Sequence, residues 1–540
     1  MQPPARKHTC WALLHERRYI FFSVRTNFGI LSSMVLKLYN TYAKREEEFV
    51  PIKKGKVRMY TCGPTVYGRP HIGNYSSFLM ADLLRRWLQF GLGYDVTHVK
   101  NITDVGHLVA DADEGEDKVE KEARRIAQEQ RGKGAKITMK DVLAVAEMYT
   151  QQYLEDEKTL NLVEPEHRPK ATETIPEMIA TVEKLVKNGH AYETDDGVYF
   201  SVESFPDYGK LSGNTLENLE SGSRVAVKEQ KKHPADFALW KKCIGENANH
   251  VLRWDSPWGV GFPGWHIECS AMATKFLGEC LDIHTGGEDN IFPHHESEIA
   301  QSECASGKHP YVRYWVHKRR INIASTSSAQ GGVEKMSKSL GNVLTIPDIT
   351  EMGYSPLDLR YYFLSVHYRT QLKFTKRGLE GARKARRKIV ESFIAMQEII
   401  AQGPDDMAGS MMAGQIQPMK GLFIDAMNDD LNTPGALAQV FNITNIFNVS
   451  KTQMAPGYSR EDIEKMKLFM DLVRNTFGCF EPEESEPVPE AVEQLLDRRA
   501  KAREEKDFQT SDRLRDEIRA LGYEVRDTDG GQSVKQSPKR

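Results

Sequence analysis

The sequence predicts an α/β protein, in which a doubly wound parallel sheet is followed by an α-helical region and a small C-terminal module. Three observations lead to this prediction. An apolar strand at 57–62 leads through a loop rich in proline and glycine to a helix at 73–90 and a second strand at 95–102. A strand at 281–285 is again followed by a glycine turn and a helix, and helical spacing of apolar residues prevails over 356–477. Alternating strands and helices are typical of a Rossmann-like sheet with helices on both faces.

The composition is that of an ordinary globular protein, and it excludes several classes of function. With 540 residues, of which 40% are apolar and 28% charged, the chain has room for about three or four domains. The net charge of −3 excludes a generally basic nucleic-acid binder but permits local basic patches. The seven cysteines are irregularly spaced, so we expect no disulfide framework and a reducing, cytoplasmic location. We expect no membrane association, because no apolar run reaches about 18 residues.

Residues 1–34 differ in composition from the rest of the chain. They contain five Arg or Lys residues against one acidic residue, Glu16, and Arg25 interrupts their apolar part. Such a composition suits an organelle transit peptide. The alternative is a disordered extension, or an upstream translated segment with the true start at Met34. We favour the alternative, because regularly patterned sequence begins directly after Met34.

The loop that enters the first long helix contains His71-Ile72-Gly73-Asn74. A helix N-terminus offers free N–H groups and a positive dipole to phosphates, and Gly73 lets a ligand approach bare backbone. The chain contains neither a GxGxxG sequence nor a P-loop. The segment therefore predicts a nucleotide site that lacks the two commonest signatures.

Residues 104–260 are predicted to form an insert that connects the two halves of the sheet. From Asp104 to Glu147 the insert is highly charged, which favours a solvated helical segment over a binding surface. An amphipathic helix at 172–188 and a hairpin at 191–202 follow.

The stretch Gly264–Ser302 carries the strongest chemical signal. It is predicted to contain a helix from Trp265 to Phe276, a strand, and a second helix that Pro293 opens. Cys269 lies on the first helix, whereas His294 and Glu298, four positions apart, share a face of the second.

These three residues are of types that bind zinc, but their spacing is only a moderate signal. A His–Glu pair at this spacing is more often solvated than bound to a metal. A second cysteine, Cys62, ends the strand at 57–62. If the two segments lie side by side in one sheet, Cys62 completes a zinc site with Cys269, His294 and Glu298.

A cationic loop follows the predicted strand at 311–317. The polar stretch 325–332 leads to Lys335-Met336-Ser337-Lys338-Ser339. Two lysines in such surroundings predict a mobile loop that closes over phosphates and stabilises developing charge. By itself, a pair of lysines at this spacing is a weak signal, since most such loops are only solvated.

Taken together, these blocks resemble the class I aminoacyl-tRNA synthetases, and within them the cysteine–tRNA ligases. HIGN at 71–74 is similar to the HIGH element of the class, and KMSKS stands intact at 335–339. The blocks CGPTVY, NITD, SPWG, GWHIECSAM, FPHHESEIAQS and EKMSKSLGN match the cysteine-specific branch. The resemblance extends from Val35 to the C-terminus.

The resemblance implies a division of the chain. Residues 35–355 correspond to the catalytic domain, 356–480 to a helical tRNA-binding domain, and 491–528 to an anticodon-recognition module. A linker rich in proline and glutamate precedes the module, and residues 529–540 are expected to form a disordered tail.

The resemblance also implies a reaction. ATP, with Mg²⁺, activates L-cysteine to cysteinyl-adenylate, and the cysteine passes to the 3′ terminal adenosine of tRNA(Cys). One Zn²⁺, held by Cys62, Cys269, His294 and Glu298, takes the substrate thiolate in an open position. Zinc prefers the sulfur of cysteine over the hydroxyl of serine. An apolar pocket, in contrast, distinguishes these two side chains only about 10–200-fold. No editing domain is then required, and we expect a monomer.

Further roles are implied by the resemblance alone. The catalytic residues are His71, Asn74, Lys335 and Lys338. The ATP-binding residues are His71, Gly73, Asn74 and Lys338. The substrate-binding residues are Gly63, Thr103, Trp265 and Asp289. For Trp265, a role as a buried core residue is the alternative.

Two features depart from the family pattern. Asn74 replaces the second histidine of HIGH, and it can donate a hydrogen bond but carries no charge. We expect it to donate to the adenylate or phosphate in the transition state. The loop before KMSKS is longer than usual, and we expect it to be ordered only with ATP.

The helical region starts with a basic helix. Helices are predicted at 376–402, 421–448 and 460–477, and the first carries seven cations between Lys376 and Lys388. These cations either follow tRNA phosphates or form a solvated face.

Two other functions remain open at this point. A related ligase joins cysteine to an amino sugar, but such an acceptor needs no helical region or anticodon module. A non-catalytic RNA-binding relative would not need an intact KMSKS and a complete set of metal ligands. Cysteine-dependent ATP–pyrophosphate exchange and tRNA charging separate the three.

Overall fold

The computed structural model describes residues 35–106, 116–214, 231–324, 333–335, 343–405, 411–453, 457–482, 489–528 and 531–536. All of these belong to one unit of the chain, Met34–Arg540. The predicted extension 1–34, the polar loop 325–332 and Lys338 lie outside the described residues.

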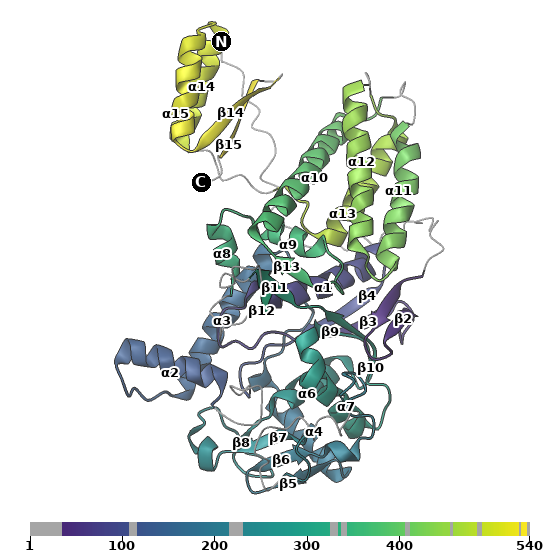
Figure 1. The fold of residues 1–540 in the computed structure, drawn as a ribbon, viewed down its shortest axis with the longest axis vertical. Coiled ribbons are helices and arrows are strands. Elements are labelled where there is room, and N and C mark those ends of the chain that lie inside the picture. Colours follow the sequence, from purple (N-terminus) through teal and green to yellow (C-terminus); the bar gives the residue numbers. More distant parts are fainter. Residues whose placement is uncertain are drawn as a thin grey trace, which may run out of the picture. The chain divides into compact units, whose positions relative to one another are not determined.

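A four-stranded parallel sheet confirms the predicted fold class. Its strands are β3 (Lys56–Thr61), β4 (Asp95–Lys100), β9 (Leu281–Gly287) and β10 (Val312–Lys318), in the order β10-β9-β3-β4 (Figure 1). The two strands before the insert, β3 and β4, thus join the two after it, β9 and β10, through the pairing of β3 with β9. Because parallel strands end at the same edge, the residues after β3 and β9 come together there.

Helices cover both faces of this sheet. The helices are α1 (Ile72–Arg86, extended by the wider turn η1, Trp87–Gly91), α6 (Trp265–Leu277) and α7 (Glu296–Ser306). Side chains of β3 alternate between two cores. Met59 packs in the core that contains α1, and Tyr60 packs in the core that contains α6. The helix α6 ends at Gly278, whose φ of +87° favours glycine.

The described residues of the insert form three long helices and most of a second, antiparallel sheet. The helices are α2 (Lys118–Arg131), α3 (Met139–Thr159) and α4 (Ile175–Lys187). The sheet has the order β5 (Ala191–Glu193), β6 (Gly197–Phe200), β7 (Phe237–Lys242) and β8 (Gly261–Pro263). The predicted hairpin is confirmed, since β5 and β6 are antiparallel neighbours.

Several short elements escaped prediction. They are β1 (Lys37–Asn40) with β2 (Arg45–Glu48), the sheet of β11 (Ile321–Ala324), β12 (Val333–Lys335) and β13 (Leu372–Phe374), and α8 (Ile346–Glu351). Each strand has three or four residues, which is too short for a period-2 pattern to be recognised.

The helical region contains one error of prediction. It comprises α9 (Pro356–Leu364), α10 (Lys376–Gln402), α11 (Met411–Asn428), α12 (Thr433–Gln453) and α13 (Arg460–Phe477). The single helix expected at 421–448 is wrong, because the chain breaks between α11 and α12. Asp430 and Leu431 have positive φ angles of 51° and 55°, which no continuous helix allows. Pro434, near the start of α12, was the missed signal.

The C-terminal module requires a second correction. It consists of α14 (Glu490–Glu504), α15 (Phe508–Ala520), β14 (Tyr523–Thr528) and β15 (Gly531–Gln536). The tail expected to be disordered from 529 therefore contains a strand, which pairs antiparallel with β14. The sequence Asp529-Gly530 between the strands is a hairpin signal that the composition of the tail obscured. Among the described helices of the whole chain, none has the length and apolar character needed to cross a membrane.

Candidate active site

Four predicted metal ligands converge at the carboxyl edge of the main sheet. Cys62 follows β3 directly, Cys269 lies on α6, His294 lies in the turn before α7, and Glu298 lies on α7. Their ligand atoms lie within 4.8 Å of one another, and all four residues are buried. The pairing of β3 with β9 produces this convergence, because it places the end of one half of the chain against the other.

The distances between these donor atoms fit the edges of a zinc tetrahedron. Cys62 Sγ lies 3.8 Å from Cys269 Sγ and 3.5 Å from Glu298 Oε1, and His294 Nε2 lies 3.2 Å from the same oxygen. Zinc bonds of about 2.3 Å to sulfur and about 2.0 Å to nitrogen or oxygen give edges of about 3.8, 3.5 and 3.3 Å. Three distances within the cluster therefore match those between ligands of one zinc ion.

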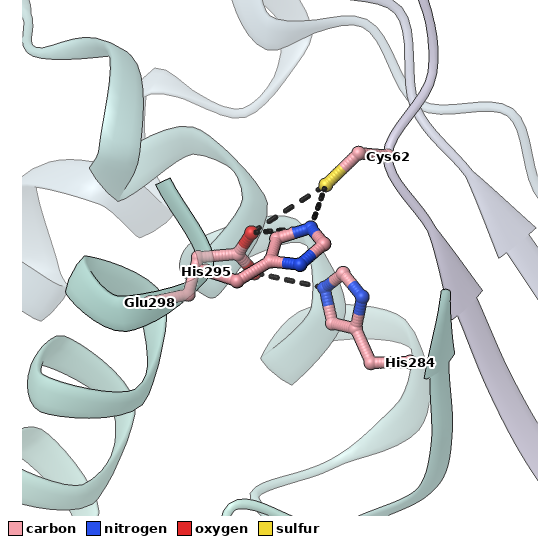
Figure 2. Close-up of side chains that lie close together, drawn as sticks. All are labelled: Cys62, His284, His295 and Glu298. Carbon is pink, nitrogen blue, oxygen red and sulfur yellow. Dashed lines mark hydrogen bonds and ion pairs between the residues drawn. The ribbon is translucent and has the colours of Figure 1, made fainter. Parts of the chain in front are cut away.

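A second group of possible ligands overlaps the first. Cys62, His284, His295 and Glu298 also have their ligand atoms within 4.8 Å. Figure 2 shows His284 and His295 directed at the other two: His284 Nε2 lies 3.0 Å from Glu298 Oε2, and His295 Nε2 lies 3.3 Å from Cys62 Sγ. The two groups share Cys62 and Glu298, and both histidines contact these two residues at hydrogen-bond length. Side chains in such positions commonly orient the ligands of a zinc ion.

Two more histidines complete this outer layer. His266 Nδ1 lies 3.0 Å from His294 Nδ1, which directs His294 Nε2 toward Glu298. His295 Nδ1 lies 2.8 Å from His317 Nε2. Sequence reasoning missed His266, His284, His295 and His317. The only available signal was their presence in strands and helices that are otherwise apolar.

The cluster carries negative charge in the absence of a metal. Burial favours the neutral thiol of Cys269, but its hydrogen bond with Cys62 and the nearby His294 together lower its pKa to about 6. Burial likewise opposes ionisation of Glu298, yet His284 and His294 lower its pKa to about 2. Burial would lower the pKa of His294, but Cys269 and Glu298 raise it to about 10. Burial and the Cys269 sulfur raise the pKa of Cys62. Two adjacent buried anions favour a cation between them.

The predicted nucleotide segment forms the start of α1. His71 is the N-cap, and its Nδ1 accepts a hydrogen bond from Asn74 N at 3.3 Å. Asn74 Oδ1 accepts from His71 N at 3.0 Å, so the two residues form a reciprocal capping box. The amide oxygen of Asn74 is thus engaged in the cap, while its NH₂ group is the part that can donate elsewhere. Ile72 N donates to Leu344 O, which joins the segment to the chain beyond KMSKS.

The predicted substrate residues occupy different positions around the cluster. Gly63 N donates to Asn101 Oδ1, and a Cβ at Gly63 would lie 1.6 Å from Asn101 O, so only glycine fits. Thr103 is buried and its Oγ1 accepts from Asn101 Nδ2. Trp265 is half-buried and stacks on the ligand His294, with ring centroids 4.4 Å apart. Asp289 follows β9, is exposed, and lies 3.5 Å from Arg320.

The cationic residues divide into described and undescribed ones. Lys335 is the last residue of β12, paired with Asn322, whereas Lys338 lies outside the described residues.

On α10, Arg386 is buried and donates to Asp358 Oδ1 at 2.7 Å and to Cys479 O at 3.1 Å. It therefore holds the fold together and is not available to RNA. The exposed cations of that helix are Lys376, Arg377, Lys384, Arg387 and Lys388.

Comparison with known families gives three matches along the chain. Residues 48–384 match the family described as tRNA synthetases class I (C) catalytic domain. Residues 422–481 match the DALR domain, and residues 485–534 match the cysteinyl-tRNA ligase anticodon binding domain.

Curated relatives resemble nearly the whole chain. A cysteine–tRNA ligase of Chlorobium luteolum is 41% identical over 512 residues, which cover 93% of this chain and 99% of the relative. An enzyme of that name from Thermus thermophilus is 40% identical over 505 residues, covering 92% and 98%. The one from Thermococcus onnurineus is 40% identical over 508 residues, also covering 92% and 98%.

Solved structures share the fold at low identity. Mycobacterium tuberculosis methionyl-tRNA synthetase with methionyl-adenylate has a TM-score of 0.53 and 13% identity, covering 78% of this chain and 90% of that one. LeuRS of Agrobacterium radiobacter K84 in a ternary complex has a TM-score of 0.55 and 11% identity, covering 80% and 85%. These likenesses support the class I synthetase fold.

Proposed function

The chain belongs to the cysteine–tRNA ligases of the class I aminoacyl-tRNA synthetases, and we propose that it selects L-cysteine through one zinc ion held by Cys62, Cys269, His294 and Glu298. In this proposal it activates cysteine with ATP and transfers it to the 3′ terminal adenosine of tRNA(Cys). The observation that carries the proposal is the convergence of four buried donor atoms within 4.8 Å of one another, three of whose distances match those between zinc ligands.

The choice of zinc rests on the donor set. Two thiolates, an imidazole and a carboxylate suit zinc and exclude the hard ion Mg²⁺, which prefers oxygen ligands only. When bound, zinc supplies a Lewis-acidic site that holds a thiolate and lowers the pKa of the thiol. Serine offers no sulfur, so this site rejects it without an editing domain. Trp265, stacked on His294, borders the space beside the metal ligands.

ATP is proposed to bind at the start of α1. The first-turn N–H groups face phosphate favourably, and His71, Gly73 and Asn74 are half-buried, hence open to a ligand on one side. Lys335 and Lys338, with Mg²⁺, are proposed to neutralise the pyrophosphate side. Activation then depends on alignment and electrostatics, and no protein nucleophile is required.

The proposed tRNA contacts are the exposed cations of α10 and the C-terminal module. In the module, the partly exposed Arg503 and Arg515 approach the carboxylate of Asp527, whereas Arg499 at the same carboxylate is buried. Arg503 and Arg515 are therefore the proposed contacts of the module with the RNA backbone. That the enzyme is a monomer and acts in the cytoplasm remains a prediction.

Two assays test the proposal directly. The purified protein is expected to contain about one zinc per chain and to catalyse ATP–pyrophosphate exchange that depends on cysteine and not on serine. It is then expected to charge a tRNA(Cys) transcript. Exchange without tRNA charging would favour the amino-sugar ligase, and zinc-free protein with full selectivity for cysteine would refute the role of the metal.

A further inference from the structure

The carboxylate of Asp156, a residue of the insert, contacts the chain on both sides of the His71–Asn74 segment. Asp156, on α3, has a side chain that is only 2% exposed. Its Oδ1 accepts from Arg69 Nη2 at 2.5 Å, and its Oδ2 accepts from Arg69 Nε at 3.0 Å and from the Tyr75 hydroxyl at 2.9 Å. Arg69 precedes His71 by two residues, and Tyr75 directly follows Asn74. Asp156 therefore brackets the segment that is proposed to bind ATP.

The geometry of these contacts fixes direction as well as distance. A two-pronged pair between arginine and carboxylate holds both groups in one plane. Burial and the neighbouring Asp156 carboxylate raise the pKa of Tyr75, so its hydroxyl stays protonated and remains a donor. The capping box holds His71 and Asn74 relative to each other only. Asp156 connects both flanks of the segment to α3, in addition to the hydrogen bond from Ile72 N to Leu344 O.

The helix α3, which carries Asp156, is itself held in place by its neighbours. Tyr153, one turn earlier on α3, stacks against Tyr75 with an interplanar angle of 17°. Glu157, the next residue, accepts from the Tyr153 hydroxyl and from Arg168, and it pairs with Lys100 at the end of β4. These contacts fasten α3 to the main sheet, close to where β4 ends.

We propose that Asp156 is a positioning residue for ATP, which holds the His71–Asn74 segment in register through Arg69 and Tyr75. This inference rests on the proposed function of that segment. The insert then has a role in catalysis, although the sequence alone indicated only that it connects the two halves of the sheet. Displacement of a positioned group by about 1 Å can lower a rate about 100-fold, so the loss of Asp156 is expected to act on ATP use and to spare the metal centre.

The test compares Asp156→Ala and Asp156→Asn with Glu155→Gln, a change of the exposed neighbouring carboxylate. Pyrophosphate exchange is measured with ATP and cysteine varied separately, along with zinc content and thermal midpoint. For Asp156→Ala we expect kcat/KM for ATP to fall about 10–100-fold, with unchanged KM for cysteine and unchanged zinc. Asp156→Asn should lie between this variant and the unaltered chain, because it keeps acceptor capacity without charge.

Equal losses for ATP and cysteine, or a lower thermal midpoint with normal ATP kinetics, would overturn the inference and leave Asp156 a purely structural residue. If Asp156→Ala does not fold, Tyr75→Phe removes one hydroxyl and should still raise the KM for ATP severalfold, whereas no change there overturns the inference. Absence of cysteine-dependent exchange in the unaltered chain would instead refute the proposed function, so the two failures are distinguishable.

Discussion

The two halves of the candidate active site are held in place in different ways. The proposed metal ligands come from three separate segments, are at most 7% exposed, and are braced by histidines that contact them. The nucleotide segment is one short continuous stretch, is half-buried, and consists mainly of a helix start and its cap. A metal that discriminates by bonding needs a dry, rigid site. Phosphates need open N–H groups, so rigidity there must come from outside, as from Asp156.

The largest expected effect comes from removing a metal ligand. Cys269→Ser should abolish zinc binding and lower cysteine-dependent exchange by more than about 100-fold, the upper effect of losing an outer partner. Zinc analysis and exchange kinetics check this. Cys280→Ser, which changes a half-buried thiol of the same stretch, is the matched control. A full complement of zinc in Cys269→Ser would break the contrast between the two halves.

Substitutions of Asn74 test the role of the nucleotide segment. Asn74→Ala removes the side-chain half of the capping box and the NH₂ donor, and it should lower the exchange rate about tenfold or more, because the proposed transition-state contact is lost. Asn74→Asp keeps an acceptor for His71 N but lacks the donor. Full activity of either variant would show that Asn74 does not act on the transition state.

The basic helix α10 sharpens the comparison further, because buried and exposed cations occur on one element. Neutralising Arg377, Lys384 and Arg387 together should weaken tRNA binding and reduce the slope of log K against log salt by about 2–3. Exchange without tRNA should be unaffected. Arg386→Ala should instead destabilise the fold, since it leaves Asp358 buried without its partner. Unchanged tRNA affinity of the triple variant at low salt would contradict the assignment.

The smallest expected effect is the release of protons when zinc binds. Near pH 7.5, Cys62 and His294 of the metal-free cluster hold protons, because both pKa values are raised. Cys269 and Glu298 are already ionised, since their pKa values are lowered to about 6 and about 2. Zinc binding should therefore release about two protons, measurable by calorimetry in buffers of different ionisation enthalpy. Affinity for zinc should rise with pH at least up to about 10, where His294 loses its proton, because Cys62 with its raised pKa also holds a proton below that pH.

His294 and Glu298 stabilise the metal-free fold over different ranges of pH. His294, with a raised pKa, stabilises the metal-free fold below its ordinary value of 6.5, and this contribution is lost as pH rises toward about 10. Glu298, with a lowered pKa, stabilises the fold above its ordinary value of 4.5, and this contribution is lost as pH falls toward about 2. Thermal midpoints of the protein, measured across this pH range after a chelator has removed the metal, check the loss of stability at both the alkaline and the acid end. An acid-side loss that persists in Glu298→Gln would assign it to another group.

Much of the local structure could be predicted from local pattern. The strand before Cys62, the helix from Trp265 and the helix α10 follow from apolar spacing and from start and stop residues such as Gly278. The break between α11 and α12 and the final strand β15 were missed. In both cases the composition of a longer stretch outweighed a short turn signal. The resemblance of the motifs to one family led to the function.

The sequence by itself determined which residue types were available for metal and phosphate chemistry and on which helices and strands they lie. Only the tertiary structure decided that Cys62 and Cys269, 207 positions apart, meet at 3.8 Å, and that histidines and Asp156 brace the two halves of the site. The physical reason is that propensity and periodicity act over one or two turns, whereas these contacts depend on β3 pairing with β9 across the insert at 104–260.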